Sequence, residues 1–146
     1  MSFQNVRSVS MTVLSASADI PQRRFVTWKV TTGLTLPATA NDSDTIVGVT
    51  LEGYDDSTAD LGESSDTVPV ALLDGAIMEV EAGAAVTQGA RIIAGNDGRA
   101  IVSTTTAGGT VPAGDYQEVG IALTAASAAG EIITFVSLRG PIVTTS

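Results

Sequence analysis

The chain has 146 residues, a net charge of −9 and neither histidine nor cysteine. Its length suits a single domain that buries its own hydrophobic core. Without histidine and cysteine it lacks the usual general base, the commonest metal ligand and any thiolate or disulfide, so we expect no enzyme, no cofactor and no metal site. The acidic balance also argues against nucleic-acid binding, which needs a basic surface.

No stretch of the sequence is typical of a membrane anchor or an export signal. Its apolar runs are shorter than the roughly 18 residues that a spanning helix needs. The N-terminal residues, Met1 to Arg7, lack the apolar centre of a signal peptide. We therefore expect synthesis in a cytoplasm and no membrane association.

Charge is distributed unevenly along the chain. Residues 1–30 hold four basic residues and one acid, whereas residues 31–90 hold eleven acids and no basic residue. One interpretation is a basic N-terminal segment that meets an acidic surface, either its own or a neighbour's. The other is a solvated acidic face that only keeps the protein soluble.

Residues 1–24 have no clean period, because their apolar and polar side chains alternate only roughly. Small polar residues follow up to Pro21. The pattern predicts an extended N-terminal arm and linker over 1–24, followed by a single β-rich domain over 25–146. An ordinary first strand within the first 21 residues is the alternative.

The rest of the chain reads as short strands, because β-branched residues are frequent and fifteen glycines supply turns. The period of two predicts strands over 24–32, 46–51, 68–73, 75–80, 119–123 and 132–138. Residues 125–130 are rich in alanine but too few for a stable helix, so we expect a small-residue connection. Trp28 is expected to anchor the core, with an interface anchor as the alternative.

Residues 54–66 form an acidic loop between two predicted strands. Four of its acids could be imagined as calcium ligands: Asp55, Asp56, Asp60 and Glu63. The ordered spacing of a calcium loop is missing, so a solvated loop is the simpler interpretation.

The strongest local signal lies in residues 80–102. Asn96, Asp97 and Gly98 separate two apolar pairs, Ile92-Ile93 and Ile101-Val102. Asn, Asp and Gly tolerate the backbone conformations of tight hairpin turns, so the pattern predicts a β-hairpin. We expect this stretch to form the centre of a barrel-like core.

Two parts of the chain resemble each other. Residues 47–78 and 119–143 each contain a strand, a loop, a Gly-Glu pair, a second strand, a glycine bend and an apolar continuation. The similarity predicts two related β-units around one core, as in a small β-barrel or sandwich. Chance similarity between glycine-punctuated strands is the alternative.

The order of these motifs resembles the decoration, or cement, proteins of tailed-phage capsids. The shared succession begins with Ile46-Val47-Gly48-Val49 and ends near Leu138, and it includes Asp97-Gly98-Arg99-Ala100 and both Gly-Glu pairs. The long acidic loop departs from that pattern. The resemblance implies an all-β domain on the outside of the virion, bound to the major capsid protein, as a homotrimer that bridges neighbouring subunits.

The resemblance also implies an N-terminal arm that takes part in the contact with the shell. Its basic and apolar residues are the candidate capsid-binding residues: Phe3, Val6, Arg7, Arg23 and Arg24. Deleting residues 1–20 is then expected to leave a folded domain that no longer binds shells. The alternative function is a virion surface module that recognises a host surface or glycan.

Overall fold

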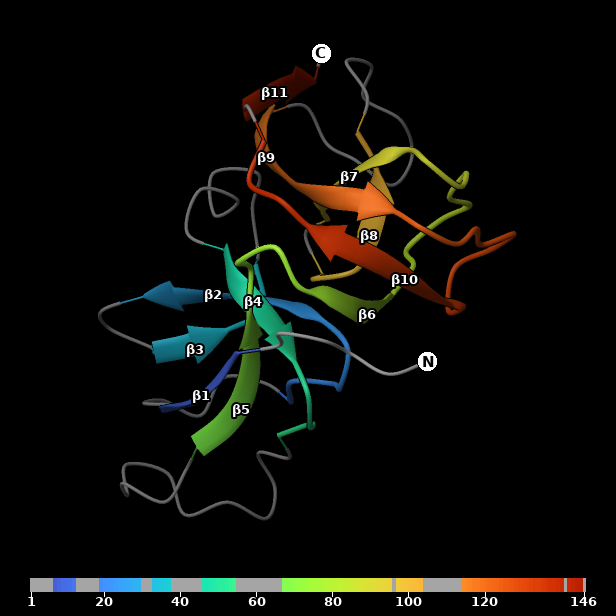
Figure 1. Cartoon of the computed structure of the whole chain (residues 1–146). Helices are drawn as coiled ribbons and strands as arrows, with labels where there is room; N and C mark the ends of the chain where they lie inside the picture. Colours follow the sequence, from blue (N-terminus) through green and yellow to red (C-terminus); the bar gives the residue numbers. More distant parts are fainter. Residues whose placement is uncertain are drawn as a thin grey trace.

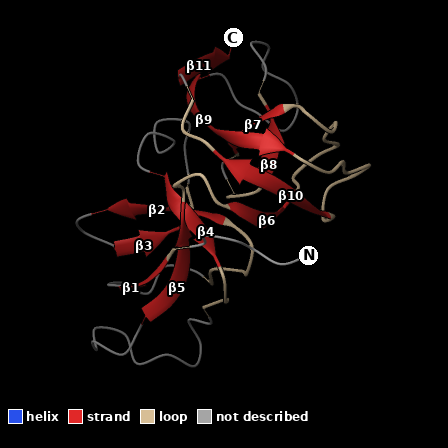
Figure 2. Ribbon diagram, in the orientation of Figure 1, coloured by secondary structure: helices blue, strands red, loops and turns tan. Residues whose placement is uncertain are grey.

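The computed structural model describes residues 7–12, 19–29, 33–37, 46–54, 67–95, 97–103, 114–140 and 142–145. These residues form eleven β-strands and no helix (Figure 2). The strands make two antiparallel sheets, whose hydrogen-bonded ladders do not close into barrels over the described residues. The predicted all-β, sandwich-like fold is confirmed.

The first sheet contains five strands in the order β1-β5-β4-β2-β3. Their bounds are Ser8–Thr12 (β1), Phe25–Lys29 (β2), Gly33–Thr35 (β3), Ile46–Thr50 (β4) and Thr67–Leu72 (β5). Figure 1 shows these strands together in one half of the molecule. We call this half the first unit.

The second sheet follows the order β6-β10-β9-β7-β8, and β11 adds to one end of β9. The bounds are Ile77–Glu81 (β6), Arg91–Ala94 (β7), Ala100–Val102 (β8), Gly114–Ala122 (β9), Ile132–Ser137 (β10) and Ile142–Thr145 (β11). Strands β6 to β10 occupy the other half of the molecule in Figure 1, and we call them the second unit.

The two units are copies of one arrangement. Each strand of the first sheet has its counterpart five strands later, in the same position of the second sheet. The registers agree as well: Gly48 pairs with Leu72 as Gly120 pairs with Ser137, and Val49 pairs with Ala71 as Ile121 pairs with Val136. The similarity seen in the sequence therefore reflects a repeated β-unit.

The repetition extends to irregular features that the sequence similarity did not cover. Both units have a register shift in their second strand, between Val26 and Thr27 in β2 and between Ile92 and Ile93 in β7. Isolated bridges also correspond, Ile20 with Tyr54 and Val86 with Ala126. Matching irregularities of this kind show that the whole five-strand unit is repeated.

A left-handed backbone position precedes the second strand of each unit. In the first unit it is Arg23, with φ of 59°, and in the second it is Gly89, with φ of 85°. Each residue donates its N–H to the strand beside it, Arg23 to the Thr50 carbonyl at 2.9 Å and Gly89 to the Ala122 carbonyl at 2.8 Å. In each unit, this turn directs the chain into the second strand.

Glycine is required where the two central hairpins pack most closely. A Cβ added to Gly48 would lie 2.0 Å from the Ala71 carbonyl oxygen, and one added to Gly120 would lie 2.4 Å from that of Val136. Real Cβ atoms do not approach backbone oxygens so closely. These contacts explain why both copies keep glycine here.

Each unit buries its own inner apolar face. The first-unit cluster consists of six buried residues: Ile20, Val26, Leu34, Tyr54, Val68 and Val70. Their second-unit counterparts are likewise buried together: Val86, Ile92, Ala100, Ala126, Ile133 and Phe135. The repeated backbone therefore carries a repeated core.

A shared interface joins the two units. Phe25, Val49 and Ala71 form a row across β2, β4 and β5, on the face opposite Val26, and all three are at most 1% exposed. They belong to the same apolar cluster as the core of the second unit. The Phe25 and Phe135 rings meet edge to face, with centroids 5.5 Å apart.

Most elements predicted from the sequence are present in the structure. The six predicted strands exist, with ends that shift by a few residues, and the hairpin around the Asp97-Gly98 turn joins β7 and β8. Residues 123–131 form no helix, as expected. The stretch 80–102 is central only in part: its strand β7 lies inside the second sheet, whereas β8 and the end of β6 lie at the two edges of that sheet.

The predicted core role of Trp28 is wrong. The residue is 36% exposed near the end of β2, although its cross-strand neighbour Leu34 on β3 is buried. Phe25 and Phe135, both 0% exposed, provide the aromatic packing between the units.

Candidate functional site

Arg7 and the strand that follows it lie inside the range predicted as an arm. Strand β1 pairs with β5 along its whole length, and the Arg7 carbonyl accepts a hydrogen bond of 2.8 Å from the Leu72 N–H. The Arg7 side chain is 81% exposed, and its Nε lies 3.4 Å from Asp74 Oδ2. An ordinary edge strand therefore presents this guanidinium to solvent.

Val9 adds an apolar group beside Arg7. It points to the same side of β1 by the period of two, and it is 42% exposed. Arg7 and Val9 together form a small basic and apolar strip on the edge of the first sheet, which we call the β1 strip.

Arg23 lies at the contact between the two units. Its backbone carbonyl accepts a 2.9 Å hydrogen bond from the Glu81 N–H. Its guanidinium is 39% exposed and lies 3.6 Å from Glu79 Oε1. The side chain remains accessible while the backbone is held.

Arg24 differs from Arg7 and Arg23 in that its side chain is buried and ion-paired. It is 8% exposed, and its Nη1 donates to the Asp97 carbonyl at 3.0 Å. Its Nη2 lies 3.1 Å from Glu81 Oε2, which also meets Arg99 Nε at 2.7 Å. Arg24, Glu81 and Arg99 therefore form an ion-pair network that ties the first unit to β6 and to the hairpin of the second.

The structure thus separates the predicted capsid-binding residues. Arg7 and Arg23 offer accessible guanidinium groups, whereas Arg24 is committed to the contact between the units. Phe3 and Val6 lie outside the described residues, as do the four loop acids considered for calcium.

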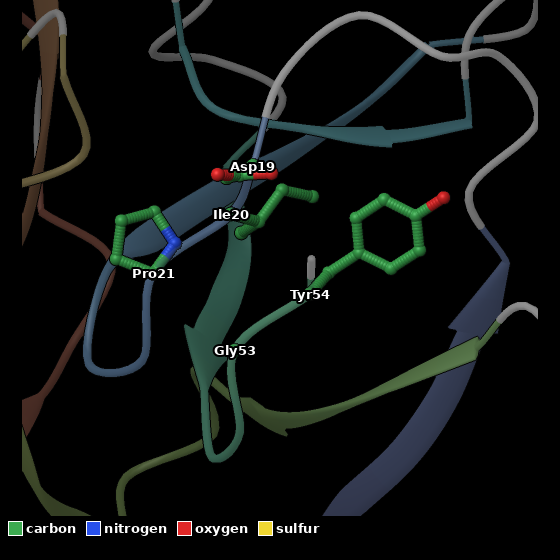
Figure 3. A pocket seen from close by; sticks show the side chains of 5 residues that line it. All are labelled: Asp19, Ile20, Pro21, Gly53 and Tyr54. Atoms are coloured by element: carbon green, nitrogen blue, oxygen red, sulfur yellow. The ribbon is translucent and has the colours of Figure 1, made fainter. Parts of the chain in front are cut away.

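A shallow hollow lies at the start of the first unit. It has a volume of about 340 Å³ and is lined by Asp19, Ile20, Pro21, Gly53 and Tyr54 (Figure 3). The backbones of Ile20 and Tyr54 exchange two hydrogen bonds, of 2.9 and 2.7 Å, across it. Ile20 is 3% exposed, so residues 19–21 belong to the folded body rather than to a detached linker.

Sequence reasoning missed a buried charge in the second unit. Glu118 is 6% exposed and accepts a 2.7 Å hydrogen bond from the Ser103 hydroxyl, while Arg91 Nη1 lies 3.5 Å from its other oxygen. Its counterpart in the first unit is Ile46, which is fully buried. Only the comparison between the units reveals this exchange of an apolar residue for a charged one.

The described residues contain no group of three or more Asp or Glu side chains that could hold a metal ion. Over the same ranges, no helix has the length and apolarity needed to cross a bilayer.

These features indicate the broad class of protein to which the chain belongs. Two fused β-units, joined by an apolar interface and an ion-pair network, with one accessible arginine beside the β1 edge and another near the contact between the units, are typical of a structural or binding protein. The sequence matches the family model of phage cement proteins over residues 4–139. The chain therefore belongs to the phage cement protein family, whose members are structural components of phage capsids. No curated protein matches the sequence significantly.

Proposed function

We propose that this chain binds the outer surface of an assembled phage head as a homotrimer and bridges neighbouring major capsid protein subunits. The family membership over residues 4–139 is the observation that carries the proposal. A protein that binds only the assembled lattice stabilises that lattice by mass action. Three copies held together would multiply weak contacts through avidity.

The N-terminal residues are our candidates for the shell contact. Arg7 and Val9 of the β1 strip are exposed, and the Arg7–Asp74 pair is a surface ion pair. Such pairs contribute little to stability, so Arg7 can exchange Asp74 for an acidic group on the shell at small cost. Arg23 is a second accessible cation, and Phe3 and Val6 complete the proposed set.

The folded position of β1 changes how this contact should be tested. Deleting residues 1–20 removes β1 from the edge of the first sheet and removes the buried Ile20. Such a deletion would damage the fold and the contact together. A single substitution at an exposed position separates the two effects.

The experiment is co-sedimentation of the purified protein with heads that lack it. Wild-type protein is expected to sediment with the heads and to saturate. Arg7→Glu should weaken binding about tenfold or more, while thermal unfolding stays within about 0.5 kcal/mol of wild type, as for other exposed substitutions.

Asp74→Asn is the matched control. It breaks the same ion pair but keeps the Arg7 charge, so it should leave binding unchanged or strengthen it. Equal losses from the two variants would mean that the pair matters only inside the chain, and wild-type protein that fails to sediment with heads would refute the proposed function.

A further inference from the structure

Strands β1 and β6 fill equivalent edge positions of the two sheets. β1 pairs with β5 and β6 pairs with β10, and the two ladders have the same register. The Leu72 N–H donates to the Arg7 carbonyl at 2.8 Å, and its counterpart, the Ser137 N–H, donates to the Ala76 carbonyl at 2.9 Å. The two strands therefore have equivalent backbone contacts on the sheet.

The side chains of the two strands differ in burial. On the side that faces the core, β6 places Met78 and Val80, which are 2% and 0% exposed. The equivalent β1 residues are Val9, which is 42% exposed, and Met11, which is half-buried. None of residues 7–11 is buried. Strand β1 therefore has the backbone hydrogen bonds of its counterpart without the two buried apolar side chains.

The contacts that hold β1 are mainly ones that water can replace. Apolar burial supplies most of the free energy that holds a strand on the edge of a sheet, because each backbone hydrogen bond largely replaces one to water. The ion pair between Arg7 and Asp74 adds little, since the Arg7 side chain is 81% exposed. Segments with few buried side chains and exposed backbone bonds are the first parts of a fold to open.

We infer that β1 is a releasable strap, which leaves β5 while the rest of both sheets stays folded. Its release uncovers the edge of β5 beside Val68 and Val70, the residues that pair with Met11 and Val9. The inference concerns the free chain and does not depend on the proposed function. It bears on that function because the β1 strip moves with β1, so a contact that draws the strip away from β5 competes only with local opening.

Two neighbouring amides of β5 distinguish release of β1 from wider unfolding. The Leu72 N–H points to β1, where it bonds to the Arg7 carbonyl. Backbone groups of successive residues point to opposite sides of a strand, so the Ala71 N–H points to β4, where Ala71 pairs with Val49. Release of β1 frees the Leu72 amide and leaves the Ala71 amide bonded.

The test is native-state hydrogen exchange of the full-length chain, measured by NMR as a protection factor for each amide. The Leu72 amide should be protected at least about a hundredfold less than the Ser137 amide, because β1 lacks the two buried side chains of β6. The Ala71 amide should be protected at least about tenfold better than Leu72. Urea below the unfolding transition should speed exchange at Ala71 and leave Leu72 nearly unchanged, because local opening exposes little surface.

A reversible lock on β1 provides a second measurement. Ser10 and Pro69 lie opposite each other on β1 and β5, and the chain has no cysteine of its own. Ser10→Cys combined with Pro69→Cys therefore gives a single disulfide between directly opposed residues. The oxidised variant should protect the Leu72 amide at least about tenfold better than the same variant reduced with dithiothreitol.

Three results would overturn the inference: equal protection of Leu72 and Ser137, exchange of Leu72 that follows urea together with Ala71, or an oxidised lock that leaves Leu72 exchange unchanged. Sedimentation with heads is measured separately. If β1 stays paired in protein that binds heads, the strap is refuted and the proposed function stands. If β1 is released in protein that never binds heads, the reverse holds.

Discussion

Phe25→Ala removes one of the two phenylalanine rings that meet at the interface between the two units. Phe25 is fully buried, and its ring packs edge to face on Phe135 with centroids 5.5 Å apart. Truncating a buried phenylalanine to alanine costs about 4 kcal/mol, because both the burial and the surrounding contacts are lost. We expect a loss of that size in the free energy of unfolding.

Urea unfolding followed by circular dichroism measures this loss. With a slope of about 2 kcal/mol per molar urea, the midpoint should fall by about 2 M. If the alanine variant does not fold, Phe25→Leu keeps most of the volume and should cost about 1.5 kcal/mol. The counterpart substitution, Arg91→Ala, is the control and should cost less than about 1 kcal/mol, because that side chain is 62% exposed.

A loss below about 1.5 kcal/mol for Phe25→Ala, at an unchanged slope, would refute the reasoning. It would mean that the two units hold together without this contact. A similar loss for Phe25→Ala and Arg91→Ala would contradict the exposure of Arg91 on the second sheet.

Three further predictions concern single positions. Gly120→Ala should destabilise the fold by about 3 kcal/mol, because its Cβ would lie 2.4 Å from a carbonyl oxygen, and a cost below 1 kcal/mol in urea unfolding would contradict this. Arg23→Gly should be more stable than Arg23→Ala by roughly 1 kcal/mol, since both lose the pair with Glu79 but only glycine relieves the positive φ; equal midpoints would argue against that strain. The Glu131 pKa lies below its ordinary value of 4.5, chiefly because the Ser127 hydroxyl donates to its carboxylate. The hydrogen bonds between Ser127 and the Glu131 carboxylate are therefore fully present above pH 4.5 and are lost as the pH falls through the lowered pKa. NMR titration of the Ser127 amide should therefore give a midpoint below 4.5, and a midpoint at or above it would contradict the assignment.

Local signals in the sequence predicted much of the fold. The hairpin at Asp97-Gly98 and the two central hairpins could be predicted because turn residues and alternation act over a few positions. The repetition of the unit was visible in the sequence only in the two central hairpins, because both copies need glycine at the equivalent positions Gly48 and Gly120. Strands β1 and β6 share a register but have dissimilar sequences, because many side chains satisfy the same backbone hydrogen bonds.

The candidate site was harder to predict, because its contacts are distant in sequence. The basic N-terminal residues were evident, but nothing local distinguishes the buried Arg24 from the accessible Arg23. The partner that decides the difference, Glu81, lies 57 residues away. Trp28 was misplaced for a similar reason, since its exposure depends on where the covering elements end rather than on the period of β2.

The ion pairs of Glu81 have a consequence for how the chain folds. Because the units share one pairing pattern, β6 fits the slot of β1 beside β5 as well as its own slot beside β10, and β5 is its neighbour in sequence. In the wrong slot, Glu81 would lie opposite Thr67, away from the positions where Arg24 and Arg99 meet it in the native fold. The exchange would leave the buried Arg24 guanidinium without its carboxylate, which is costly, so Glu81 favours the native pairing. Because the backbone pairing pattern is the same in both units, side-chain contacts must distinguish the two slots, and the ion pairs of Glu81 do so.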